Sequence, residues 1–170
     1  MVRRVLVDDY NFKYVGKDTA DHLIQALKKL YTISINWTGS LYCGLTIKCD
    51  YNKSICDISM PTYIQEALHK FQHIAPSCPQ DYPHAWNQPV YGASVQYSDQ
   101  PDDSPLLPPK SINLVQQIIG TLLYYFIYVD PTMLIAIDAI TSQKSKATQA
   151  TRDSTVWILN YAASHPNAII

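Results

Sequence analysis

The sequence lacks the features that mark membrane proteins, secreted proteins and strongly basic nucleic-acid binders. Its longest apolar run, residues 118–129, is too short to cross a bilayer. The first residues lead into an acidic segment without the apolar core of a signal peptide. Formal net charge is only -1, with +2 in residues 1–75 and -3 in residues 76–170. We therefore expect an intracellular protein, cytoplasmic or nuclear, with no membrane partner and no strong overall positive field.

Paired metal-binding cysteines are also missing. The chain has four cysteines, Cys43, Cys49, Cys56 and Cys78, and none are spaced as the C-x-x-C knuckles of a zinc site. Without a secretion signal, four cysteines in a chain of this size are typical of reduced thiols. The sequence therefore predicts neither a zinc site nor a disulfide.

The 170 residues are 47% hydrophobic, which suits one ordinary domain or two small ones. Their patterning predicts an α+β fold. Eight of the eleven prolines lie between Pro76 and Pro109, where apolar periodicity is lost. We therefore predict three regions: a mixed α/β region (1–75), a proline-rich linker (76–110) and an all-helical tail (111–170).

Alternating apolar residues predict a β-hairpin over residues 4–15 with its tip at Asp8 and Asp9. A helix capped by Asp18 follows, then strands over residues 31–37, 41–48 and 55–59, and a helix over residues 61–71. The apolar positions expected to be buried in these two helices are Leu23, Ile24, Leu27, Leu30, Ile64, Ala67, Leu68 and Phe71.

Three helical patterns fill the tail. The first is expected to be capped by Ser111 and to end near Tyr128, and the second to restart at Asp130 and Pro131. A third is marked by Val156, Trp157, Leu159 and Tyr161 and ends before Pro166. The positions expected to be buried in the first two are Val115, Ile118, Ile119, Leu122, Phe126, Met133, Leu134, Ile137, Ala139 and Ile140.

Asp8 and Asp9 are the candidate functional residues. Two adjacent carboxylates at a hairpin tip supply oxygen ligands of the kind that Mg²⁺ or Mn²⁺ prefers, and polymerases hold their catalytic metals in this way. An Asp pair in a tight turn is also ordinary turn chemistry, because the carboxylates accept bonds from nearby backbone N–H groups. The pair alone does not decide between these two interpretations.

The order of motifs along nearly the whole chain resembles the C-terminal part of a copia-type retrotransposon reverse transcriptase: palm hairpin, thumb and connection. Leu6-Val7-Asp8-Asp9 resembles the aromatic-Val-Asp-Asp palm motif of that family. Three further segments resemble family motifs in the same order: Leu41-Tyr42-Cys43-Gly44-Leu45-Thr46-Ile47, Ile58-Ser59-Met60-Pro61-Thr62-Tyr63-Ile64, and Ile119-Gly120-Thr121-Leu122-Leu123-Tyr124-Tyr125 with Val129-Asp130-Pro131. Trp157-Ile158-Leu159-Asn160-Tyr161 is similar to the helix that precedes the ribonuclease H region.

This resemblance implies an RNA-directed DNA polymerase, a nucleotidyltransferase that acts on an RNA/DNA primer–template. It assigns Asp8 and Asp9 as catalytic and metal-binding residues for Mg²⁺ or Mn²⁺. In the family a third carboxylate comes from an upstream strand, and here we expect that strand, the fingers and the ribonuclease H to be missing. We therefore expect weak metal binding and an inactive fragment, and Leu6 departs from the usual aromatic residue.

Two alternatives stay open at this stage, as does the oligomeric state. Beside the polymerase fragment, one alternative is a non-catalytic nucleic-acid-binding or assembly module derived from a mobile element. The other is an independent metal-dependent phosphotransferase or hydrolase. The second alternative needs another carboxylate near Asp8, and the nearby candidates in sequence are Asp18, Asp21, Asp50 and Asp57. A local basic face for nucleic acid would draw on Arg3, Arg4, Lys13, Lys17, Lys28 and Lys29.

Overall fold

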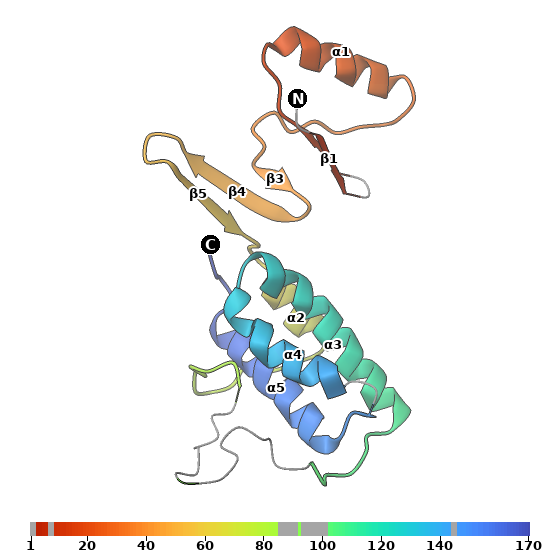
Figure 1. The fold of residues 1–170 in the computed structure, drawn as a ribbon, viewed down its shortest axis with the longest axis vertical. Coiled ribbons are helices and arrows are strands. Elements are labelled where there is room, and N and C mark those ends of the chain that lie inside the picture. Colours follow the sequence, from red (N-terminus) through yellow and green to blue (C-terminus); the bar gives the residue numbers. More distant parts are fainter. Residues whose placement is uncertain (1–2, 7–8, 85–91, 93–101, 144–145) are drawn as a thin grey trace. The chain divides into compact units, whose positions relative to one another are not determined.

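The computed structural model describes residues 3–6, 9–84, 92, 102–143 and 146–170 (Figure 1). Its fold is α+β, with a three-stranded sheet, a separate two-stranded hairpin and a helical C-terminal part. The chain forms two compact units, an N-terminal unit, Met1–Ile58, and a helical unit, Ser59–Ile170.

The N-terminal unit begins with an antiparallel hairpin of β1 (Arg3–Leu6) and β2 (Asp9–Phe12). Arg3 faces Phe12 and Leu6 faces Asp9. Helix α1 (Lys17–Lys28) follows, and then a sheet in the order β3-β4-β5. The strands of this sheet are β3 (Leu41–Tyr42), β4 (Leu45–Asp50) and β5 (Ile55–Ser59).

Three local features of the N-terminal unit differ from the sequence-based expectation. Residues 41–48 do not form one strand. Cys43 and Gly44 both have positive φ, 51° and 76°, so they make the tight turn that suits a two-residue hairpin between β3 and β4. Residues 31–37 lie outside the strands, and the side chain of Asn36 accepts bonds from the backbone N–H groups of Thr38 and Gly39, a local alternative to sheet pairing. Helix α1 starts at Lys17 with Gly16 as its N-cap, so Asp18 lies within the first turn instead of capping it.

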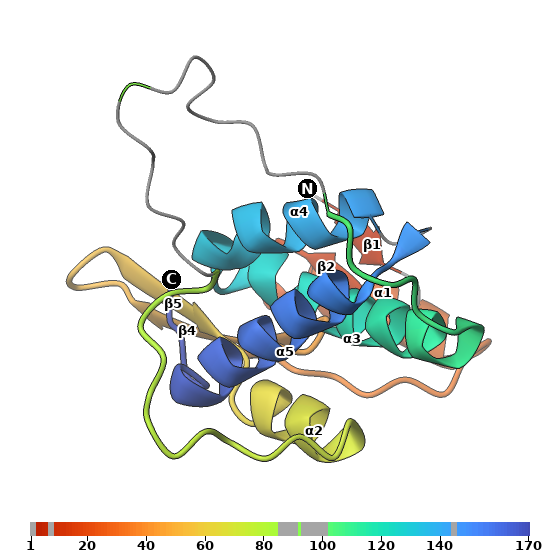
Figure 2. The ribbon, with the colours of Figure 1, turned by 90° about the horizontal axis from the view of Figure 1, so that it is seen from below.

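The helical unit packs α2 (Tyr63–Lys70) and α5 (Gln149–Ser164) against α3 (Pro109–Tyr128), and α4 (Leu134–Gln143) contacts both α3 and α5 (Figures 1 and 2). A short 3₁₀ turn, η1 (Pro131–Met133), joins α3 to α4. The five residues expected to be buried in α3 are all buried, and Tyr125 joins them. The apolar periodicity of that helix was therefore a correct guide to its packed face.

The other helices match the expected pattern less closely. In α4 the buried set includes Ala136 in place of Leu134 and Ala139, which are more exposed. Helix α3 starts at Pro109, two residues before Ser111, because proline is well suited to the first helical turn. Asp130 is the N-cap of η1 with Pro131 at its first position, as expected.

Helix α5 begins at Gln149, well before the apolar residues by which its pattern was recognised. The reason is a capping box. Thr148 Oγ1 accepts from the N–H of Thr151 at 3.3 Å, and the N–H of Thr148 donates to Thr151 Oγ1 at 3.1 Å. The helix ends before Pro166, as the sequence predicted.

The described parts of the proline-rich segment are attached to the helical unit by hydrogen bonds. The N–H of Gln80 donates to Ser164 Oγ at 2.9 Å, and the indole N–H of Trp157 donates to the carbonyl of Tyr82 at 2.9 Å. Leu106 and Thr148 form an isolated β-bridge. The boundary between the two compact units lies between Ile58 and Ser59, because α2 and this segment pack with the later helices.

Within the described part of the chain, none of the helices combines the length and the apolar character that crossing a bilayer requires.

Candidate functional site

Of the two candidate carboxylates, Asp9 is described and Asp8 lies outside the described residues. Asp9 is the first residue of β2, and the β1–β2 register pairs it with Leu6 across the hairpin. Its side chain is exposed. The hairpin expected from the sequence is therefore present, with the described carboxylate on a strand end.

The Asp9 carboxylate is held by a turn that is distant in sequence. The backbone N–H of Cys43 donates to Asp9 Oδ2 at 2.8 Å. Because Cys43 is in the left-handed conformation, with Gly44 following it, the hairpin turn between β3 and β4 presents this N–H to the carboxylate. The bond orients the Asp9 carboxylate through Oδ2. The Cys43 N–H does not use the second oxygen, Oδ1, which can still bind a cation.

The described residues do not complete a metal cage around Asp9. Among them, no cluster of three or more His, Cys, Asp or Glu side chains is arranged to hold an ion. Asp50 accepts bonds from the N–H groups of Asn52 and Lys53 and lies 3.5 Å from Lys53 Nζ, so it shapes the β4–β5 turn. A Mg²⁺ ion requires near-octahedral oxygen coordination, which these carboxylates alone do not provide.

A row of aromatic side chains, which we call the aromatic row, lies on the N-terminal unit. Tyr10, Phe12 and Tyr14 alternate along and just beyond β2, with adjacent ring centroids 5.8 and 6.0 Å apart. Trp37 continues the row edge-on to Tyr14 at 5.9 Å, and Lys17 Nζ lies 5.1 Å from the Trp37 ring. The two-residue spacing indicated that Phe12 and Tyr14 share a face, but nothing local indicated that Trp37 would join them.

The aromatic residues of α3, which also raise the possibility of base stacking, are largely structural. Tyr125 and Phe126 are buried, and Tyr63 stacks on Tyr125 with centroids 5.9 Å apart and planes 12° apart. The Tyr63 hydroxyl donates to the carbonyl of Thr121 at 2.8 Å. Burial raises the pKa of both Tyr63 and Tyr125, as expected for phenols kept neutral inside a helical core.

His69 and His73 do not form a metal pair on α2. His73 lies beyond the helix end and its Nε2 is 2.8 Å from Oδ1 of Asn160 on α5, so that contact fixes the ring.

Comparison with known proteins gives no relative. No protein-family model matches the chain, and searches of curated proteins and of solved structures return no significant match.

Proposed function

We propose that these 170 residues are a fragment of a retrotransposon reverse transcriptase that does not synthesise DNA by itself. Support comes from the ordered series of motifs and from Asp9, which starts the second strand of an antiparallel hairpin directly after the position of Asp8. The partial palm and the thumb-like region belong to this proposal, as does the RNA/DNA primer–template as partner.

The proposed inactivity rests on the incomplete set of metal ligands at Asp8 and Asp9. Asp8 and Asp9 would hold Mg²⁺ or Mn²⁺, which supplies charge stabilisation for phosphoryl transfer when bound. Asp9 already gives one oxygen to the N–H of Cys43, and the described residues bring no third carboxylate to it. Two adjacent carboxylates repel each other, and without further ligands little offsets the cost of dehydrating the ion.

Primer extension on an RNA template tests this proposal. The full chain is incubated with Mg²⁺ or Mn²⁺ and all four deoxynucleotides, next to the Asp8→Asn variant as a control for contaminating polymerase. We expect no template-directed product from either protein. Incorporation by the parent chain that disappears in Asp8→Asn would refute the proposed inactivity.

The aromatic row favours a second candidate function, non-catalytic binding of a nucleic-acid strand. Tyr10, Tyr14 and Trp37 are 37%, 41% and 43% exposed, so their rings are accessible to bases, and Lys17 adds a positive charge next to Trp37. Aromatic side chains stack on bases without regard to sequence, and alanine substitution of such a residue costs about 1–3 kcal/mol per base. Lys17 by itself adds only a weak phosphate-binding component.

Fluorescence anisotropy with a labelled single strand at low salt tests this second function. Trp37→Ala is expected to weaken binding about fivefold or more, from the stacking energy above. Tyr51→Ala is the matched control, because Tyr51 is 88% exposed in the β4–β5 turn and is not a member of the row. Equal losses in the two variants, or no binding at low salt, would exclude the aromatic row as a binding surface.

A further inference from the structure

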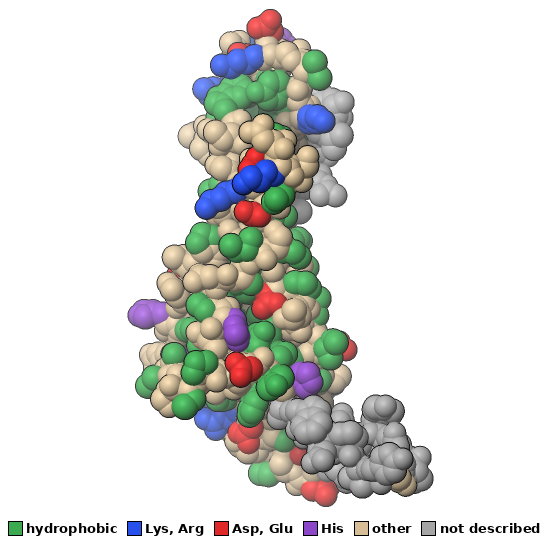
Figure 3. Space-filling model, turned by 90° about the vertical axis from the view of Figure 1, so that its left-hand side faces the viewer, with side chains coloured by type: hydrophobic (Ala, Val, Ile, Leu, Met, Phe, Trp, Pro, Cys, Tyr) green, Lys and Arg blue, Asp and Glu red, His purple; other side chains and the backbone are tan. Residues whose placement is uncertain are grey.

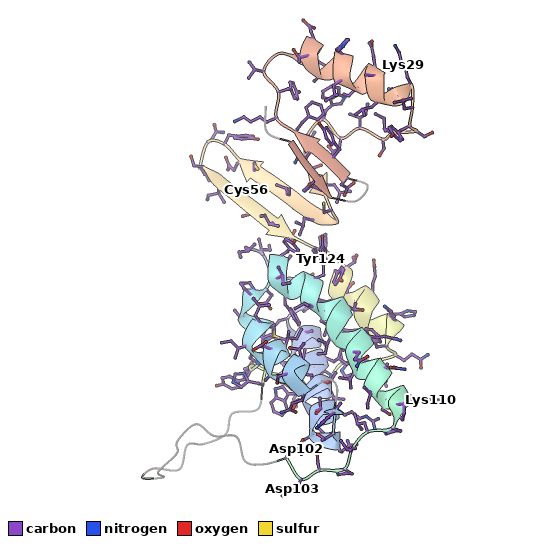
Figure 4. All side chains as sticks on the ribbon, turned by 45° about the vertical axis from the view of Figure 1, so that its right-hand side comes forward. Lys29, Cys56, Asp102, Asp103, Lys110 and Tyr124 are labelled. Atoms are coloured by element: carbon purple, nitrogen blue, oxygen red, sulfur yellow. The ribbon has the colours of Figure 1, made fainter. Side chains whose placement is uncertain are left out.

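Two of the four cysteines come together on the β4–β5 hairpin. Cys49 Sγ and Cys56 Sγ are 2.9 Å apart, and both side chains are exposed. Figure 4 shows Cys56 on β5, next to β4. The hairpin therefore places the two free thiols side by side, within hydrogen-bond distance of each other.

The hairpin geometry explains the closeness. Residues 51–54 form the turn, so Cys49 and Cys56 are each the second strand residue from it. Residues that face each other in an antiparallel pair have Cα atoms about 4.5–5.5 Å apart, within the range that a disulfide bridges without moving the backbone. The turn is itself braced by Asp50, which accepts from two backbone N–H groups.

We propose that Cys49 and Cys56 are a reversible dithiol–disulfide couple that reacts by thiol–disulfide exchange with a low-molecular-weight disulfide such as oxidised glutathione. The Cys49 thiolate attacks one glutathione sulfur, forms a mixed disulfide and expels a glutathione thiolate. Cys56 then loses its proton, attacks the Cys49 sulfur and expels the second glutathione thiolate. Both thiolates take up protons, so two protein thiols are oxidised and one glutathione disulfide is reduced to two thiols.

The two thiols are hydrogen-bonded to one another. The hydrogen bond with Cys49 raises the pKa of Cys56, and desolvation acts in the same direction. The same disulfide and the same two glutathione thiols form whichever of the two sulfurs attacks first. The other two cysteines lie outside the β4–β5 hairpin: Cys43 is in the β3–β4 turn, six residues before Cys49, and Cys78 is in the segment before residue 85.

Tryptic mapping gives a direct test, because the sequence separates all four cysteines. Cleavage after Lys48 and Lys53 places Cys49 on peptide 49–53 and Cys56 on peptide 54–70, whereas Cys43 and Cys78 fall on peptides 30–48 and 71–110. The full chain is equilibrated in glutathione buffers of defined ratio, quenched with acid, alkylated and digested. We expect peptides 49–53 and 54–70 to be recovered joined by one disulfide, while the other two are recovered alkylated.

The same glutathione series repeated in guanidinium measures how much the fold contributes to closing the Cys49–Cys56 disulfide. Because a native hairpin that holds the two sulfurs together must favour ring closure, we expect the closure equilibrium to be at least about tenfold more favourable in the native chain than in guanidinium. The Cys56→Ser variant should instead accumulate glutathione on Cys49. Equal closure in the native and denatured chains, or recovery of peptides 49–53 and 54–70 as separate alkylated species in the native chain, would overturn the proposal.

Discussion

The helical unit and the N-terminal unit differ in how they bury apolar side chains. Of the 21 buried hydrophobic residues among those described, only Ala20 and Ile24 belong to the N-terminal unit. Val15, Leu30 and Tyr51 of that unit are 94%, 77% and 88% exposed. Figure 3 shows hydrophobic side chains interspersed with polar ones on the surface that it presents.

This difference indicates that the two units depend on different forces. The helical unit has a continuous apolar core of the kind that dominates folding free energy. The N-terminal unit relies on short strand ladders, aromatic contacts and single hydrogen bonds such as that between Asp9 and Cys43. Contacts of the latter kind contribute about 1 kcal/mol each, so we expect this unit to open first.

The largest expected effect comes from the core of the helical unit. Leu122 on α3 is fully buried, and Leu122→Ala is expected to lower the free energy of unfolding of that unit by about 3 kcal/mol, through lost transfer energy and the cavity left behind. Urea unfolding of the full chain followed by residue-resolved amide exchange measures this. Ile127→Ala, at a position 51% exposed on the same helix, is the matched control and should change stability much less.

The same exchange experiment on Ile24→Ala tests whether the two units open independently. Ile24 is buried in α1 of the N-terminal unit, so its loss is expected to increase exchange there and leave the helical unit unchanged. A common shift in both units after either substitution would mean that the chain unfolds as one cooperative body. It would contradict the expectation that the N-terminal unit opens first.

An intermediate effect is expected at the start of α5. Thr148→Ala removes the cap of that helix and should cost about 1 kcal/mol, whereas Thr148→Ser keeps the hydroxyl and most of the stability. Thermal unfolding measured by circular dichroism compares the three proteins. If the alanine and serine variants are equally stable, the capping bond does not stabilise the helix.

Asp102, which accepts hydrogen bonds from Ser104 and from Thr148 at the start of α5, makes the stability of the fold depend on pH. The hydrogen bond from Ser104 is the main cause that lowers the pKa of Asp102, and the bond from Thr148 adds to it. Asp102 lies in the segment that leads into α3 (Figure 4). A carboxyl whose pKa is lower in the folded state stabilises the fold above its unfolded pKa, near 4, and loses this contribution as the pH falls through its folded pKa. Asp102→Asn should therefore reduce the loss of stability below about pH 4.

The smallest expected effect concerns Asp9. Asp9→Ala removes the acceptor of the Cys43 N–H, so amide exchange at Cys43 should increase about fivefold, as for the loss of one hydrogen bond of about 1 kcal/mol. Asp9→Asn retains an acceptor oxygen and should exchange like the parent chain. Unchanged protection in Asp9→Ala would show that this bond does not hold the β3–β4 turn.

Sequence reasoning succeeded where the structure depends on local periodicity. The packed face of α3, the hairpin of β1 and β2 and the end of α5 before Pro166 all follow from apolar spacing or proline chemistry. It failed at residues 31–37, where strict alternation predicted a strand that the structure does not contain. There the side chain of Asn36 forms local bonds instead, an outcome that alternation of apolar residues does not reveal.

The candidate site was predicted only in part. The hairpin and the position of Asp9 were visible as a motif, but the partner of its carboxylate is a backbone N–H 34 residues away. That N–H is available because Cys43 adopts a positive φ, which is uncommon for a residue other than glycine and is not signalled by its side chain.

Local sequence patterns were sufficient for the packed face of α3, for the hairpin of β1 and β2 and for the end of α5, because each requires only a repeating apolar pattern or a turn or cap residue within a few positions. The tertiary structure alone decided that Asp9 meets Cys43, that Cys49 meets Cys56 and that Trp37 joins Tyr14. These contacts depend on how turns and loops direct the chain, and small differences in backbone conformation there move side chains by several ångströms while leaving the local pattern of residues unchanged.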